Sequence, residues 1–140
     1  MQDFVSKSTE ETERFAYDFA KGLKAGDVVA FEGDLGAGKT AFVRGMAKAL
    51  GDESEVSSPT FAIVNEYDTF PKIFHFDMYR IETFSELYSI GFFEYLERGG
   101  ICAIEWSENI YNALPDNSIF VNIETLSENE RMIKVREGKE

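Results

Sequence analysis

One segment of the chain has the residue types and the spacing of a phosphate-binding loop. Gly33 to Thr40 reads Gly-Asp-Leu-Gly-Ala-Gly-Lys-Thr and matches G-x-x-x-x-G-K-[ST] at every fixed position. Glycines let the backbone curl tightly, so that N–H groups converge on an anion at a helix N-terminus. Lys39 is expected to reach the β- and γ-phosphates, and the Thr40 hydroxyl is expected to bind Mg²⁺. The segment therefore predicts nucleotide binding.

Hydrolysis of a nucleotide needs two further groups, one for the metal ion and one to orient water. Two carboxylates are candidates. Glu105 ends the apolar run Ile101 to Ile104, and Asp77 lies near the end of another strand-like segment. Carboxylates at the C-terminal ends of strands lie where ligands bind in open α/β sheets. The residues alone do not rank the two, and either could instead be a solvated carboxylate at a strand end.

Four other residues are candidates for the site. Thr60, in the segment Ser-Ser-Pro-Thr-Phe, could face the γ-phosphate as a switch threonine, or could belong to a turn before a strand. His75 is the only histidine, and a lone histidine is more often structural, although it shares a strand face with Asp77. Trp106 could pack at a strand end. Arg80 could pair internally or lie near the phosphates, and no arginine is identified as an arginine finger.

The elements that must position these residues follow from hydrophobic periodicity. An apolar run at Val28 to Phe31 predicts a strand before the loop, and a helical pattern after it runs to Leu50, with Gly51 beyond its end. The other predicted elements are a helix begun by a capping box at Ser8 to Glu11, a hairpin of Phe61 to Tyr67 with Lys72 to Met78, a helical region from Thr83 to Leu96 broken near Gly91, a buried strand at Ile101 to Ile104, and a hairpin of Ile119 to Ile123 with Met132 to Val135.

These elements predict an α/β fold. We expect a single-domain P-loop nucleotide-binding fold over residues 1–140, with a mixed parallel/antiparallel sheet flanked by helices. The strand before the phosphate loop is expected to be central. The chain has 140 residues and is 44% hydrophobic, which suits one core.

Composition excludes several classes of function. The net charge is −12, and no Lys or Arg occurs from Ala49 to Pro71, Ile81 to Glu97 or Gly99 to Glu130. This argues against direct binding to nucleic acid, which needs basic surface. No apolar run approaches the ~18 residues of a membrane span, and no apolar segment marks a secretory signal. The single cysteine, Cys102, fits a small buried side chain in a reducing compartment, so we expect a cytoplasmic location.

The order of four short motifs resembles one known family. GDLGAGKT, SPTF, HFDMYR and IEWSE follow one another in a chain that resembles the bacterial tRNA threonylcarbamoyladenosine biosynthesis ATPases, the TsaE family, from Ser8 to about Arg131. The phosphate loop alone is common to many families, whereas the four motifs in this order are specific. The resemblance covers nearly the whole chain.

The resemblance implies a role for each matching residue. Thr40 and Glu105 would bind Mg²⁺, Asp77 would serve hydrolysis with Lys39, and Thr60 would be the switch-like threonine. Trp106 matches a tryptophan beside the site. The implied nucleotide contacts are Thr9, Leu35, Gly36, Ala37, Gly38, Lys39, Thr40 and Arg131.

The resemblance also implies a biological role. The chain would be an Mg²⁺-dependent ATPase required for threonylcarbamoyladenosine at position 37 of tRNA. It would act with the TsaD and TsaB transferase subunits as a regulator or recycling factor, and would meet tRNA only indirectly. Weak hydrolysis in isolation is expected, because a partner would supply any arginine finger.

Three other functions share the phosphate loop. A small-molecule kinase is the main alternative, although 140 residues leave little room for an acceptor domain and a lid. A GTPase would need a guanine-reading N-K-x-D motif, which the sequence lacks. A nucleotide-gated binding module without hydrolysis is the third. Transfer of phosphate to a metabolite, competition between ATP and GTP, and tRNA modification by a hydrolysis-deficient variant would separate them.

Overall fold

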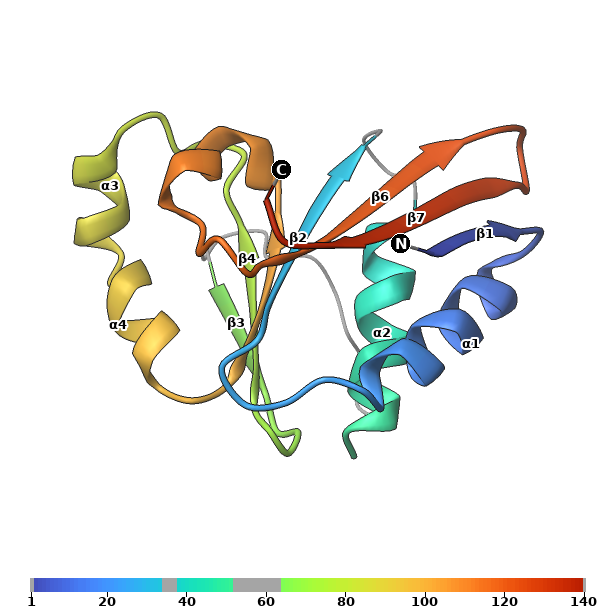
Figure 1. Ribbon diagram of the computed structural model, residues 1–140, viewed down its shortest axis with the longest axis horizontal. Coiled ribbons are helices and arrows are strands. Elements are labelled where there is room, and N and C mark those ends of the chain that lie inside the picture. The colour runs from blue at the N-terminus through green and yellow to red at the C-terminus, as the bar shows by residue number, and fades with distance from the viewer. Residues whose placement is uncertain (1, 34–37, 52–63, 140) are drawn as a thin grey trace.

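The computed structural model describes residues 2–33, 38–51 and 64–139. Within these residues, seven strands form one sheet in the order β1-β7-β6-β2-β5-β4-β3. Figure 1 shows helices on both sides of the sheet, with α1 and α2 together on one side and α3 and α4 on the other. The predicted α/β fold with a mixed sheet and flanking helices is confirmed.

The bounds of the elements show how short most of them are. The strands are β1 (Gln2–Ser6), β2 (Val28–Gly33), β3 (Val64–Tyr67), β4 (Ile73–Asp77), β5 (Ile101–Glu105), β6 (Ile119–Thr125) and β7 (Arg131–Glu137). The helices are α1 (Thr9–Ala20), α2 (Lys39–Ala49), α3 (Phe84–Ser89), α4 (Phe92–Glu97) and the 3₁₀ helix η1 (Ser107–Ala113).

The centre of the sheet is parallel and its margins are antiparallel. β2 pairs in parallel with both β5 and β6, and β4 pairs in parallel with β5. The hairpins β3–β4 and β6–β7 and the pair β1–β7 are antiparallel. As predicted, β2 is central, so the segment that follows it leaves from the middle of the carboxyl edge, where ligands bind in open α/β sheets.

Two hydrophobic cores occupy the two faces of the sheet. One core packs Phe31 of β2 and Ile101 of β5 against α1 and α2, with Phe42 of α2 fully buried. The other packs Phe76 of β4 and Phe120 of β6 against α3, α4 and η1. The alternation predicted for β4 is confirmed, because consecutive residues of a strand enter different cores.

Local signals set the helix boundaries. The Ser8 hydroxyl accepts a hydrogen bond from the N–H of Glu11 at 3.1 Å and so caps α1. The Glu11 carboxylate accepts from the N–H of Lys7, one residue before the partner that a capping box would predict. The predicted break at Gly91 is confirmed, since this residue separates α3 from α4 with φ of 77°.

Two elements of the structure were not predicted. β1 pairs with β7 at the edge of the sheet, and its segment Gln-Asp-Phe-Val-Ser shows no clear apolar alternation. Side chains of an edge strand face solvent more often, which weakens the pattern. η1 follows β5 and is short, with non-helical backbone at Ile110. Residues 61–63 of the predicted strand Phe61 to Tyr67 lie outside the described residues.

Candidate functional site

The phosphate loop joins the central strand to α2, as its motif requires. Gly33 ends β2 with φ of 117°, and a Cβ there would collide with the backbone oxygen of Ile123 on β6. Gly38 precedes α2 with φ of 102°. Both backbone conformations are strained for any residue with a side chain, so both glycines are required by geometry. Leu35, Gly36 and Ala37 lie outside the described residues.

Lys39 is buried at the start of α2. Its Nζ donates a hydrogen bond to the backbone oxygen of Gly33 at 3.4 Å and lies 5.1 Å from the centre of the Trp106 ring. The residue is only 4% exposed. A buried ammonium requires compensating negative charge, and an oxygen-rich anion held by the loop would supply it.

The two candidate carboxylates end neighbouring parallel strands. Asp77 of β4 and Glu105 of β5 are register partners, and β5 in turn neighbours β2. Both residues lie on the α2 face, because Ile73, four residues before Asp77, and Ala103, two residues before Glu105, belong to the core under α2. The sequence placed each at a strand end, and the sheet brings them together at the edge from which the phosphate loop leaves.

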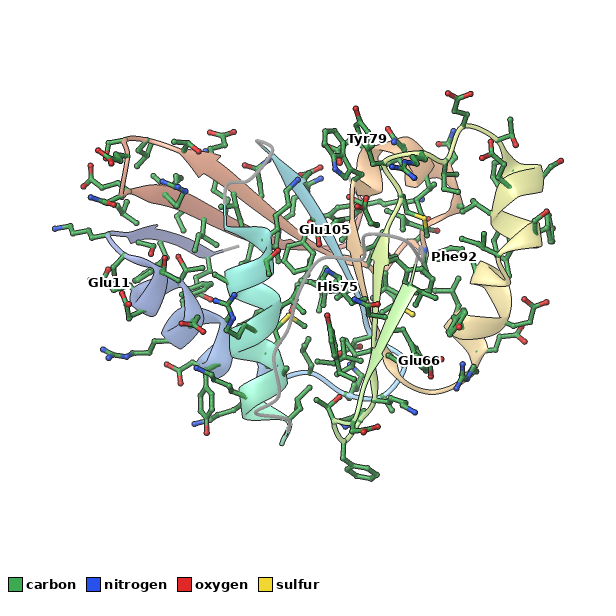
Figure 2. All side chains as sticks on the ribbon, turned by 180° about the vertical axis from the view of Figure 1, so that it is seen from behind. Glu11, Glu66, His75, Tyr79, Phe92 and Glu105 are labelled. Carbon is green, nitrogen blue, oxygen red and sulfur yellow. The ribbon has the colours of Figure 1, made fainter. Side chains whose placement is uncertain are left out.

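The Glu105 carboxylate is buried and is held by a histidine. Its Oε2 lies 2.6 Å from Nε2 of His75, and Nδ1 of His75 lies 2.9 Å from the Tyr67 hydroxyl. His75 is fully buried and Glu105 is 7% exposed. Figure 2 shows both residues near the middle of the molecule, between α2 and the strands β3 and β4. The lone histidine therefore contacts a predicted site residue directly.

Trp106 has the backbone conformation of a residue under constraint. Its φ is 58°, which is a genuine outlier for a bulky side chain. The next residue, Ser107, donates its hydroxyl to the backbone oxygen of Phe31 at 2.8 Å, which ties the turn to β2. The indole packs on Tyr79 at 4.8 Å. The turn thus holds the indole between Tyr79 and Lys39, beside the phosphate loop.

Thr9 and Arg131 both lie at a cavity beside the start of α2. They line a cavity of about 170 Å³ together with Gly38 at the start of α2. The Arg131 guanidinium donates to the backbone oxygens of Ser127 and Glu130, which fixes the β6–β7 turn at the cavity wall. The structure brings the two residues to the nucleotide loop. Their contact with a nucleotide stays a prediction.

The sequence indicated Glu105 and His75 as candidates but did not indicate Tyr67, which contacts His75. Among the predicted residues, Thr60 lies outside the described residues, and Arg80 is exposed in the turn after β4. Tyr67 was missed, because its hydroxyl meets His75 across a hairpin whose register the sequence does not reveal. A signal existed, since a tyrosine in an apolar strand usually needs a partner for its hydroxyl.

The donor chemistry fits Mg²⁺. Thr40 and Glu105 offer hard oxygen atoms, and a buried carboxylate is expected to be paired with a cation. Within the described ranges 2–33, 38–51 and 64–139, no group of three or more His, Cys, Asp or Glu residues is arranged to hold a metal ion. Mg²⁺ commonly needs only one or two carboxylates, with substrate phosphates and water completing its shell.

A glycine-rich segment lies between a central parallel strand and a helix, and Glu105 and Asp77 end the next two strands of the sheet. This order of elements is typical of P-loop nucleotide-binding proteins. The family model described as "Threonylcarbamoyl adenosine biosynthesis protein TsaE" matches residues 6–133. The chain therefore belongs to the TsaE family.

Individual relatives agree over most of their length. The chain is 44% identical to a "tRNA threonylcarbamoyladenosine biosynthesis protein TsaE" from Rickettsia prowazekii, covering 91% of this chain and 90% of the relative. It is 35% identical to a protein of the same name from Treponema pallidum, covering 94% and 97%. The crystal structure of Bacillus subtilis YdiB superposes with a TM-score of 0.79 at 33% identity, covering 98% of this chain and 84% of that one.

Proposed function

We propose that this protein is an Mg²⁺-dependent ATPase that serves the formation of threonylcarbamoyladenosine in tRNA. The observation that carries the proposal is the buried Lys39 at the mouth of the phosphate loop, facing an edge that bears Asp77 and Glu105 on adjacent strands. The family supplies the pathway, because its members are named for this modification. We place the protein in the cytoplasm, where tRNA is modified.

The chain's own groups divide the work of hydrolysis. The N–H groups at the start of α2 and the Lys39 ammonium bind the phosphates and stabilise the negative charge that develops at the γ-phosphate. The Asp77 carboxylate accepts a hydrogen bond from the attacking water and orients it in line with the bond to be broken. Tyr79 N–H donates to Asp77 Oδ1 at 3.0 Å, which restricts this carboxylate.

Thr40 and Glu105 are the residues that would hold Mg²⁺. When bound, the ion would neutralise negative charge on the phosphates. Thr9 and Arg131 would contact the nucleotide from the cavity beside Gly38. Thr60 is proposed as the switch-like threonine on the basis of the family resemblance alone.

The charge of the chain favours a protein partner over bare tRNA. A net charge of −12 opposes approach to a phosphate backbone. We propose that the TsaD and TsaB subunits bind this protein and that its ATP turnover regulates or recycles their complex. A partner that supplies an arginine would raise a slow intrinsic rate, as arginine fingers do in other P-loop proteins.

Hydrolysis is tested by phosphate release from ATP with purified protein, alone and with TsaD and TsaB. We expect Lys39→Ala and Asp77→Ala each to lower the rate by about 10²-fold or more. Lys48→Ala, on the exposed side of the same helix, and Asp116→Ala, whose side chain is 99% exposed, are matched controls. Wild-type rates from Lys39→Ala or Asp77→Ala would refute the role assigned to that residue.

The pathway is tested in cells. Deleting the gene should lower threonylcarbamoyladenosine in bulk tRNA, measured by mass spectrometry of nucleosides. Wild-type protein should restore the level, and Lys39→Ala should not. Unchanged levels after deletion would refute the proposed pathway even if the purified protein hydrolyses ATP.

A further inference from the structure

Three polar side chains from three neighbouring strands form one continuous chain of hydrogen bonds. Tyr67 of β3 contacts Nδ1 of His75 on β4 at 2.9 Å, and Nε2 of His75 contacts Oε2 of Glu105 on β5 at 2.6 Å. Tyr67 is 7% exposed, His75 0% and Glu105 7%. The chain starts inside the core under α2 and ends at the carboxyl edge of the sheet, as Figure 2 shows for its last two members.

The carboxylate of Glu105 determines which group donates and which accepts in these hydrogen bonds. An ionised carboxylate only accepts hydrogen bonds, so Nε2 of His75 must carry the proton that it shares with Glu105. In the neutral imidazole with its proton on Nε2, Nδ1 is an acceptor, and the Tyr67 hydroxyl donates to it. Each group thus has one role, and the partner of one ring nitrogen sets the state of the other.

We propose that Tyr67 and His75 are positioning residues that hold the Glu105 carboxylate in place at the phosphate site. The inference rests on the proposed function, in which Glu105 binds Mg²⁺. A carboxylate that turned away would leave the Nε2–H group without a partner in a fully buried position, which is costly. Partners of this kind, behind a ligating group, orient the ligand and commonly change metal affinity when they are removed.

The strand register makes the arrangement possible. His75 is opposite Ala103 on β5, and Asn65 is opposite His75 on β3. Glu105 lies two residues beyond Ala103, and Tyr67 lies two residues beyond Asn65, so all three side chains are on one face. The small Ala103 leaves the imidazole room to reach along β5.

The first test needs no nucleotide. Because the chain has a single histidine, protein labelled with ¹⁵N-histidine gives one set of imidazole signals. We expect Nε2 to carry the proton that it shares with Glu105, and Nδ1 to be hydrogen-bonded to the Tyr67 hydroxyl. Tyr67→Phe should shift the Nδ1 signal, whereas Tyr95→Phe, which also removes one phenol hydroxyl, should not. An Nε2 without a proton in the wild type would overturn the proposal.

The second test measures metal affinity by titrating Mg²⁺ into protein saturated with a non-hydrolysable ATP analogue. The fluorescence of the single tryptophan, Trp106, reports binding. We expect His75→Leu to weaken the apparent Mg²⁺ affinity about 10–100-fold. His75→Gln, which keeps an N–H donor for Glu105, should restore part of the loss. Affinity for the analogue without Mg²⁺ should not change.

The outcomes distinguish failure of the positioning role of Tyr67 and His75 from failure of the proposed function. If the wild type binds no Mg²⁺–nucleotide, the proposed function fails. The histidine spectrum still shows whether His75 donates a hydrogen bond to Glu105. If His75→Leu is folded by circular dichroism and binds Mg²⁺ like the wild type, the positioning role is wrong. Tyr67→Phe is the milder variant in case His75→Leu does not fold. It should weaken Mg²⁺ affinity several-fold, and an affinity equal to that of Tyr95→Phe would also overturn the proposal.

Discussion

The two faces of β4 and β5 differ in chemistry although their residues alternate along the same short strands. Toward α3 and α4, Phe74 and Phe76 of β4 lie beside Cys102 and Ile104 of β5, and all four are buried among apolar side chains. Toward α2, the same strands end in polar groups, with His75 bonded to the Glu105 carboxylate.

In this small fold, the residues that stabilise the sheet and the residues that can react lie on different faces. The face toward α3 and α4 packs aromatic rings edge to face, as with Phe76 against Phe92 and Tyr95. Such contacts stabilise the fold and leave no group to react. The face toward α2 changes from apolar to polar along each strand, so the reactive end of the site is built on a rigid base. Mutations on the apolar face should therefore lower mainly the free energy of unfolding, and mutations on the polar face should lower mainly the rate of hydrolysis.

The largest expected effect is on stability, from truncation on the apolar face. Phe76→Ala should lower the free energy of unfolding by about 3–5 kcal/mol, because it removes a fully buried ring and leaves a cavity. Urea denaturation followed by circular dichroism measures this change. Phe70→Ala is the control, since Phe70 is 90% exposed. A loss below about 1 kcal/mol would break the contrast between the faces.

The second effect is on activity, from a change on the polar face. Glu105→Gln keeps the size of the side chain and removes the charge, so ATP hydrolysis should fall about 10²–10³-fold. The free energy of unfolding should change much less than in Phe76→Ala, because Gln keeps an oxygen that accepts a hydrogen bond from Nε2 of His75. Glu66→Gln, at a partly exposed carboxylate on β3 paired with Lys72 and Arg98, is the control. Hydrolysis at the wild-type rate would remove Glu105 from the site.

The third effect is absent at neutral pH and concerns the thiol on the apolar face. Burial raises the pKa of Cys102 from 9.0 to about 12. The folded protein therefore binds a proton that the unfolded chain loses, and stability declines as the pH rises from 9.0 toward about 12, by up to about 1.4 kcal/mol per pH unit. Cys102→Ala should show a shallower decline in denaturation over this range. Equal slopes for both proteins would contradict the burial effect.

The sequence predicted the elements on both faces with different success. Apolar periodicity was enough for β2, α2, β4 and β5, because each carries a strong local pattern. β1 was missed, since an edge strand needs a partner, β7, to define it. η1 was missed because the tie of Ser107 to the backbone of Phe31 joins residues far apart in the chain.

The phosphate-loop motif, the charge of the chain and the strand ends that carry Asp77 and Glu105 can be recognised in the amino-acid sequence alone. These are local properties, since a motif or an alternation is written in consecutive residues. The register pairing of the two carboxylates, and the hydrogen bonds that link Tyr67, His75 and Glu105, depend on how the strands assemble into the sheet. Strand order and register depend on which hydrophobic faces pack together across the whole sheet. A pattern in consecutive residues does not contain that information.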